Sequence, residues 1–332
     1  MIGQETHEVE RKIAAILKVL SDSTEPLGGR VISRRLKEQG VDLNERTVRY
    51  HLKMMDERGF TRSIGYRDGR TITQPGLEEL KNALVCDKVG FVTDRIELLA
   101  YLTTFDLAGH TGDVPIDVSL LHKREFPRAL EAMKNVFEAG LCSSNQVAVA
   151  SAGERLGQTI VPEDNIGFAT VCNAMVSGSL LKAGIPLDSR FGGILQMRDH
   201  FPMRFVDLIE YEGSTLDPFE IFIAGRMTCV IEAARSGAGK ILASFNEIPM
   251  PSISAVEAVL ERLNIAKFCN SVTLGKANEA VCEIPVRFNR IGMVLPSGLN
   301  AVAAVAETGM NVTTKAMNGV IGVGELRSFW SL

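Results

Sequence analysis

The segment Asn44-Glu45-Arg46-Thr47-Val48-Arg49-Tyr50-His51-Leu52-Lys53 decides how the N-terminal part of the chain folds. Asn44 suits the N-cap of a helix, because its side chain can accept a hydrogen bond from a free amide of the first turn. Val48, Leu52 and Met55 are spaced at i, i+4 and i+7, which places them on one buried stripe. The polar residues off this stripe are Arg46, Thr47, Arg49, Tyr50 and Lys53. A short helix with this outer face suits the major groove of DNA, where such side chains reach base edges and phosphates.

The flanking sequence predicts a complete winged helix. Apolar residues recur at helical spacing over residues 8–20 and 28–38, and Gly40 suits the end of the second helix. The third helix is expected to end at Gly59. Residues 60–73 then alternate as strands do, around an Asp-Gly pair that favours a tight hairpin turn. Arg67 and Arg70 flank this pair, so the hairpin is a wing with a basic tip.

The charge distribution also favours nucleic-acid binding by this part of the chain. Residues 30–70 contain 11 Lys and Arg against 6 Asp and Glu, whereas the whole chain contains 36 against 40. A basic patch on an otherwise acidic protein is typical of a module that binds nucleic acid. Two alternatives remain open at this point: the arginines only solvate a helical domain, or the winged helix binds another protein.

Length and composition limit the other possibilities. A chain of 332 residues, 45% of them hydrophobic, has room for two or three domains with substantial cores. The first residues are polar, and the apolar run at 221–225 is interrupted by Glu220 and Arg226, so we expect no signal peptide and no membrane span. The six cysteines form no C-x-x-C pair, which argues against zinc fingers and disulfide scaffolds. We therefore expect a cytoplasmic protein with reduced thiols.

The larger C-terminal part differs in composition and pattern, with frequent glycines and a mixture of strand and helix patterns. We predict a winged-helix domain over residues 1–84, which ends in a linker helix at 75–83, and a second domain over residues 85–332. Its strands are expected at 147–149, 166–171, 205–209, 240–244 and 291–295, and its helices at 128–139, 174–182, 254–263 and 300–307. Strands and helices without strict alternation indicate an α/β or α+β fold.

A weak internal repeat suggests that the second domain arose by duplication. A shift of 125 residues aligns Ile166-Gly167 with Ile291-Gly292 and Gly184 with Gly309. The predicted repeats are residues 85–207 and 208–332. The alternative is two unrelated α/β units with similar turns.

The repeat also suggests a site for a small anion. Arg190 and Lys315 occupy equivalent places, so they could clamp a dianion between pseudo-symmetric halves. The loops 170–173 and 296–300 each lead into a helix, whose free amides favour anions. The resulting candidate contacts are Arg190, Lys315, Cys172, Asn173, Gly192, Gly193, Ser297, Gly298 and Asn300. Taken one at a time, Arg190 and Lys315 are each better explained as plain surface charge than as ligands of an anion.

No catalytic signature stands out. Residues 236–240 resemble a P-loop, but Ala234 replaces the first required glycine and Ile241 follows Lys240 in place of Ser or Thr. The sequence shows no nucleophile motif, no paired-carboxylate motif and no metal-ligand spacing. We therefore expect neither an enzyme nor a bound cofactor or metal.

Two regions resemble known families. Residues from about 11 to 77 resemble the winged-helix module named after ribonuclease R, through the segments 29–36 and 47–52. Residues from about 88 onward resemble the regulatory domain of NrpR, the archaeal nitrogen-regulatory repressor family. This second resemblance is carried by Leu180-Leu181-Lys182-Ala183-Gly184-Ile185-Pro186, Phe191-Gly192-Gly193 and Gly298-Leu299-Asn300-Ala301-Val302-Ala303-Ala304.

The resemblance implies a homodimeric repressor that binds inverted-repeat operators of nitrogen-assimilation genes and is released by 2-oxoglutarate. In such a dimer, the helix that begins after Asn44 in each subunit would enter the major groove, and the two grooves would lie roughly 34 Å apart. The expected DNA contacts are Arg46, Thr47, Arg49, Tyr50, Lys53, Arg67 and Arg70. Two alternatives remain: a regulator of the same architecture that answers another small anionic metabolite, and an enzyme with an appended winged helix.

Overall fold

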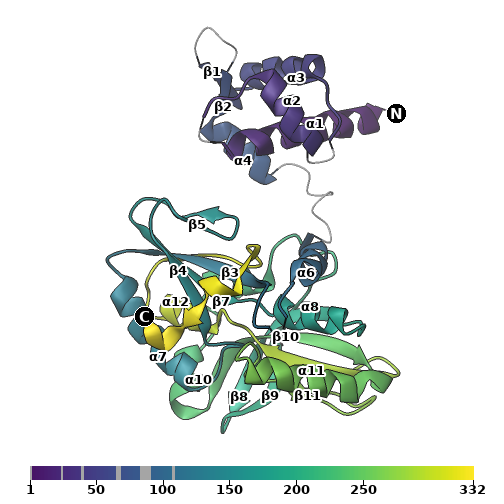
Figure 1. Ribbon diagram of the computed structural model, residues 1–332, viewed down its shortest axis with the longest axis vertical. Helices are drawn as coiled ribbons and strands as arrows, with labels where there is room; N and C mark the ends of the chain where they lie inside the picture. The colour runs from purple at the N-terminus through teal and green to yellow at the C-terminus, as the bar shows by residue number, and fades with distance from the viewer. Residues whose placement is uncertain (1, 24, 39–40, 65–68, 83–90, 107–108) are drawn as a thin grey trace. The chain divides into compact units, whose positions relative to one another are not determined.

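The computed structural model describes residues 2–23, 25–38, 41–64, 69–82, 91–106 and 109–332 of the chain (Figure 1). The chain divides into two compact units, residues 1–88 and 89–332. The domain boundary that the sequence predicts, after residue 84, lies among residues 83–90 and therefore outside the described part. Within the described residues, no helix combines the length and apolar composition that crossing a membrane requires.

The first unit is a winged helix, as predicted. Its elements are α1 (Ile2–Ser21), α2 (Gly29–Glu38), α3 (Glu45–Glu57), β1 (Thr61–Ile64), β2 (Gly69–Ile72) and α4 (Gln74–Asn82). The two strands pair antiparallel, with Thr61 opposite Ile72 and Ile64 opposite Gly69. Helix α1 begins six residues before the predicted start.

The helix predicted at residues 75–83, at the end of the first domain, is present as α4. Helix α4 belongs to the first unit, since it packs against α1 and its Leu80 contacts the apolar core there. That core contains Ile16, Leu17 and Ile32, all fully buried. Because Leu80 adds apolar surface to a small core, α4 stabilises the winged helix.

The second unit begins with α6 (Phe91–Leu102) and is built around two larger sheets. One has the strand order β13-β3-β7-β4-β15 and the other β11-β12-β10-β8-β9. The strands are β3 (Asp113–His122), β4 (Gln146–Ala150), β7 (Asn165–Val171), β8 (Asp188–Arg198), β9 (Phe201–Glu210), β10 (Gly239–Pro249), β11 (Thr273–Leu274), β12 (Arg290–Pro296), β13 (Val312–Lys315) and β15 (Arg327–Ser328). The helices are α7 (Phe126–Glu138), α8 (Ala174–Lys182), α9 (Pro218–Ala224), α10 (Val230–Ser236), α11 (Ile253–Ile265) and α12 (Asn300–Glu307). Shorter elements are β5 (Arg155–Leu156), β6 (Thr159–Ile160) and β14 (Val320–Gly322).

The two halves of this unit have the same order of elements. The order β3-α7-β4-β7-α8-β8 in the first half corresponds to β10-α11-β11-β12-α12-β13 in the second. Each half contributes its last strand to the other sheet, because β8 pairs with β10 and β13 pairs with β3. The helices also pack across the halves, α7 against α12 and α8 against α11 (Figure 1). This exchange supports the duplication that the 125-residue shift suggested.

Because each half contributes a strand to the other sheet, the apolar core of the second unit is formed by both halves. Two large apolar clusters each combine residues from both halves, such as Phe168 with Phe245 in one and Val118 with Leu295 in the other. The predicted strands and helices of this unit are confirmed, and α12 has the predicted bounds. The sequence did not predict α6, β3, β8, α9 or α10. Helix α6 lacks a single apolar stripe, since Leu99 is buried but Leu98 and Tyr101 are exposed.

Candidate functional site

Helix α3 is organised as the sequence predicts. Its N-cap is Asn44, whose Oδ1 accepts from the backbone N–H of Thr47 at 2.9 Å. Val48, Leu52 and Met55 are completely buried against the core of the winged helix. The apolar stripe therefore fixes the rotation of the helix, and the opposite face is left to solvent.

The outer face of α3 consists of Arg46, Arg49, Tyr50 and Lys53, all exposed. Tyr50 has 63% of its surface accessible, unusual for a large aromatic side chain. The guanidinium of Arg49 lies 2.7 Å from the carboxylate of Glu45, one turn earlier. An exposed pair of this kind stabilises a helix by less than about 1 kcal/mol, so Arg49 can exchange Glu45 for a phosphate at little cost.

Thr47 contributes less to this face than predicted. Its hydroxyl donates to Asn44 Oδ1 at 3.0 Å and is half-buried. Because that proton is already used in the cap, Thr47 positions the start of α3.

The wing contacts require a correction. Arg70 is not a free basic side chain, because its Nε donates to Asp56 Oδ2 at 2.8 Å and only 16% of the side chain is exposed. The same carboxylate accepts from the Thr61 hydroxyl at 2.5 Å. Asp56 thus holds both strands of the hairpin against α3. Arg67 lies outside the described residues.

We expect Asp56→Ala to destabilise the first unit by about 2 kcal/mol, since it removes a charge-assisted hydrogen bond and leaves Arg70 partly buried without this partner. Urea unfolding of the full chain followed by circular dichroism measures the change. Glu57→Ala, one residue later on the exposed side of α3, is the matched control and should change stability by less than about 0.5 kcal/mol. Equal effects of the two substitutions would contradict this role for Asp56.

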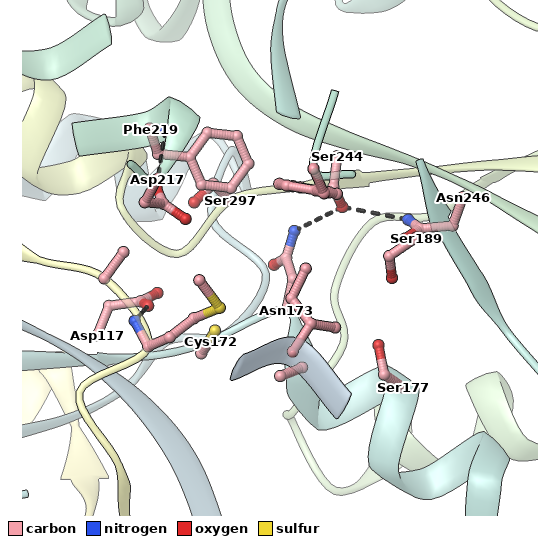
Figure 2. Close-up of a pocket in the computed structure, with 15 residues that line it drawn as sticks. Asp117, Cys172, Asn173, Ser177, Ser189, Asp217, Phe219, Ser244, Asn246 and Ser297 are labelled. Carbon is pink, nitrogen blue, oxygen red and sulfur yellow. Dashed lines mark hydrogen bonds between the residues drawn. The ribbon is translucent and has the colours of Figure 1, made fainter. Parts of the chain in front are cut away.

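The second unit contains a pocket where equivalent parts of its two halves meet (Figure 2). The pocket has a volume of about 440 Å³, which includes the space at its open mouth. Its main polar lining residues are Asp117, Cys172, Asn173, Ser177, Ser189, Tyr211, Asp217, Ser244, Asn246 and Ser297, and the apolar ones include Ile96, Phe219 and Met317.

Two buried carboxyl groups face this pocket. Asp117, on β3, accepts from the Met317 amide at 2.7 Å. Asp217 caps α9 by accepting from the amides of Phe219 and Glu220, at 2.8 and 3.2 Å. Burial raises the pKa of Asp117 to about 6, and burial together with the charges of Asp117 and Glu220 raises the pKa of Asp217 to about 7.

Neutral polar groups form the opposite wall. The Nδ2 of Asn173 donates to Ser244 Oγ at 3.1 Å and to the Leu295 carbonyl at 3.2 Å. The Nδ2 of Asn246 also donates to Ser244 Oγ, at 3.2 Å. Ser297 Oγ accepts from a backbone amide of its own loop at 3.1 Å. These bonds connect the loop after β7 with strands β10 and β12 and make this wall polar.

The structure brings three of the nine predicted effector contacts into this pocket: Cys172, Asn173 and Ser297. It does not assemble the predicted clamp. Arg190 is neutralised by the fully buried Glu247, at 2.9 Å, and Lys315 lies on the surface with a long 3.4 Å contact from its Nζ to Thr159 Oγ1. Neither cation is among the described lining residues, although their neighbours Ser189 and Ala316 are.

The remaining predicted contacts have structural roles. Asn300 is fully buried, accepts from the Leu242 amide and donates to the Leu141 and Leu242 carbonyls. A Cβ at Gly298 would lie 2.4 Å from the Val171 carbonyl oxygen. Gly192 and Gly193 lie within β8, where added Cβ atoms would meet Pro218 and the Asp207 carbonyl at 2.8 and 2.6 Å. Close packing accounts for the three glycines, and the hydrogen bonds of its side chain account for Asn300.

Helix α6 closes one side of the pocket through Ile96. Arg95 Nε donates to the Met317 carbonyl at 2.7 Å, which attaches the helix to another lining residue. Helix α6 also lies against α8 at Gly178. It is the first described element after residues 83–90.

We expect Gly178→Ala to loosen this contact and to destabilise the second unit by about 1–3 kcal/mol. A Cβ there would lie 2.6 Å from the Thr103 Cβ and 2.7 Å from the Ala100 carbonyl oxygen, so α6 must shift. Thermal unfolding measures the loss. Leu181→Ala, at an exposed position of the same helix, is the control. If the two variants unfold at the same temperature, α6 does not depend on this close approach.

Among the described residues, no group of three or more His, Cys, Asp or Glu side chains could hold a metal ion. The acids that the sequence analysis missed, Asp117 and Asp217, are separated by 100 positions. Only the fold brings them together.

Comparison with known proteins identifies the family. Residues 89–328 match the NrpR regulatory domains NRD1 and 2, and residues 14–80 match the ribonuclease R winged-helix domain. A relative from Methanosarcina mazei, named Global nitrogen regulator NrpRI, is 37% identical over 95% of this chain and 96% of its own length. The chain belongs to the NrpR family.

Other NrpR proteins are more distant. Relatives from Methanococcus maripaludis and Methanocaldococcus jannaschii, both named Global nitrogen regulator NrpR, are 31% and 29% identical, and the aligned parts span 52% and 55% of their lengths. A solved structure of a nitrogen repressor-like protein from Methanococcus jannaschii covers 72% of this chain with a TM-score of 0.60 and 25% identity. The fold of the second unit is therefore an NrpR fold.

Proposed function

We propose that this protein is a homodimeric, cytoplasmic transcriptional repressor of nitrogen-assimilation genes. Its α3 helices bind an inverted-repeat operator, and 2-oxoglutarate releases it. The observation that carries the proposal is the exposed face of Arg46, Arg49, Tyr50 and Lys53 on a helix whose opposite side is completely buried. Family membership supports nitrogen regulation, and the names of the relatives favour a regulator over an enzyme with an appended winged helix.

The effector must act through the second unit. A ligand shifts operator affinity only by binding one conformation of the protein better than another, typically by about 1–3 kcal/mol. Helix α6 provides the route, since it forms a wall of the pocket and leads toward the winged helix along the chain. Of the two cations predicted to bind the carboxylates of 2-oxoglutarate, Lys315 is the one without a strong ion pair and is our remaining candidate.

The test is operator binding measured by fluorescence anisotropy, with an inverted-repeat duplex and increasing 2-oxoglutarate. We expect the effector to weaken binding of the wild-type chain by roughly 5–150-fold. A scrambled duplex is the control for specificity. Operator affinity that does not change with 2-oxoglutarate would favour the second candidate, a regulator that answers another small anion.

We expect Lys315→Ala to bind the operator normally but to need at least about tenfold more 2-oxoglutarate for release, because one carboxylate loses its positive partner. The same titration measures both quantities. Lys276→Ala removes an exposed lysine elsewhere in the second unit and should respond as the wild type does. A normal response of the Lys315 variant would remove this residue from the effector site.

A further inference from the structure

The side chain of Arg49 does not project freely from α3. Only 58% of it is exposed, although it belongs to the outer face of the helix. Its stem lies across the first residue of α2, Gly29, which is buried. A Cβ at Gly29 would lie 3.0 Å from the Cγ of Arg49, 3.6 Å from its Nε and 3.9 Å from its Cδ. The glycine therefore leaves the space in which the arginine stem lies.

The backbones on both sides of this contact are held in place. Just before α2, Leu27 and Arg70 of β2 exchange two backbone hydrogen bonds, each 3.0 Å long. Ile32 of α2 is fully buried, and so are Val48 and Leu52 of α3. Because neither helix can move away without disturbing the core, crowding at the contact is relieved by the exposed arginine side chain.

We propose that Gly29 is a positioning residue for operator binding. Its lack of a side chain lets Arg49 lie across the start of α2, so that the guanidinium is presented to a phosphate or a base edge in one preferred direction. The pair with Glu45, at 2.7 Å, restricts the guanidinium further in the protein without DNA. A long side chain that is already ordered loses less conformational freedom when it binds. The inference rests on the proposed function and gives α2 a part in the DNA contact made by α3.

Gly29→Ala tests the inference in the full chain, by fluorescence anisotropy with the inverted-repeat duplex and no effector. Carbon atoms in normal contact are about 3.5–4.0 Å apart, so the new methyl group turns the arginine stem away. We expect operator affinity to fall roughly three- to tenfold, which corresponds to the cost of ordering one long side chain. Circular dichroism and thermal unfolding should show a folded protein of about wild-type stability, because alanine favours a helix over glycine.

Gly28→Ala is the matched control, because a Cβ at this neighbouring glycine would meet no atom within 4 Å. It should bind the operator as the wild type does. The decisive measurement places Gly29→Ala in an Arg49→Ala background. If the glycine acts through Arg49, the added methyl group causes no further loss there beyond about twofold. A methyl group that touched the DNA directly would weaken binding equally in both backgrounds.

Three binding results would overturn the inference: wild-type affinity of Gly29→Ala, an equal loss in Gly28→Ala, or an undiminished loss in the Arg49→Ala background. Unfolding of Gly29→Ala would overturn it as well, because the three atoms nearest to the new Cβ all belong to the Arg49 side chain. The proposed function is tested separately, by the preference of the wild-type chain for the inverted repeat over the scrambled duplex. Absence of that preference would contradict the proposed function, whereas the results above contradict only the role of Gly29.

Discussion

Arg49→Glu should reduce operator affinity by roughly 100-fold or more and leave the protein folded. The substitution removes a contact worth about 1–3 kcal/mol and places a negative charge against the phosphates, where each 1.4 kcal/mol is a factor of ten. In the proposed symmetric dimer the contact is lost twice. The fold should survive, because Arg49 is exposed and its pair with Glu45 contributes little. Anisotropy with operator DNA measures the affinity, and circular dichroism measures the fold.

Lys18→Glu is the matched control for this prediction. It makes the same change of charge at an exposed position of a different helix, α1. Any general loss of electrostatic attraction to DNA appears in both variants, so only the additional loss in Arg49→Glu reports on the helix face. If Arg49→Glu retains wild-type affinity, the helix does not enter the groove as proposed.

The sequence predicted correctly those elements that are defined by a short, regular spacing of apolar residues. The stripe of Val48, Leu52 and Met55 defines α3, and the run of small apolar residues from Asn300 gives the bounds of α12. Both elements bury one continuous set of side chains, which the sequence shows directly. Strand β3 was missed because Asp113, Pro115 and Asp117 interrupt its apolar pattern. Its burial depends on pairing with β7 and β13, about 50 and 195 residues later.

The candidate site was predicted only in part, for the same reason. The equivalence of the loops at Cys172 and Ser297 follows from the repeat, and both line the pocket. The exchange of β8 and β13 between the sheets is not encoded in any local pattern, and it decides which side chains meet. The positive residues that looked equivalent therefore lie outside the pocket, while acids from distant segments line it.

The network around Glu247 explains why Arg190 cannot be a free ligand for an effector. The carboxylate of Glu247, on β10, accepts from Arg190 at 2.9 Å and from the Nε of Arg287 at 2.6 Å. Arg287 also pairs with Asp188, so the group connects β8, β10 and the segment before β12. Glu247 is completely buried, and only 25% of the Arg190 side chain is exposed. The sequence expectation that Arg190→Ala affects effector release is therefore replaced by an expected loss of stability.

Glu247→Ala should destabilise the second unit by about 3 kcal/mol, because removing the buried carboxylate leaves Arg190, whose side chain is only 25% exposed, without this partner. Urea unfolding of the full chain measures the loss in the transition of the second unit. Glu257→Ala on the exposed side of α11 is the control and should shift this transition by less than about 0.5 kcal/mol. Arg190→Ala combined with Glu247→Ala should cost less than the sum of the single substitutions, because the stranded arginine is removed. Additive losses would show that Glu247 stabilises the sheet without this arginine, and would leave Arg190 available to a ligand after all.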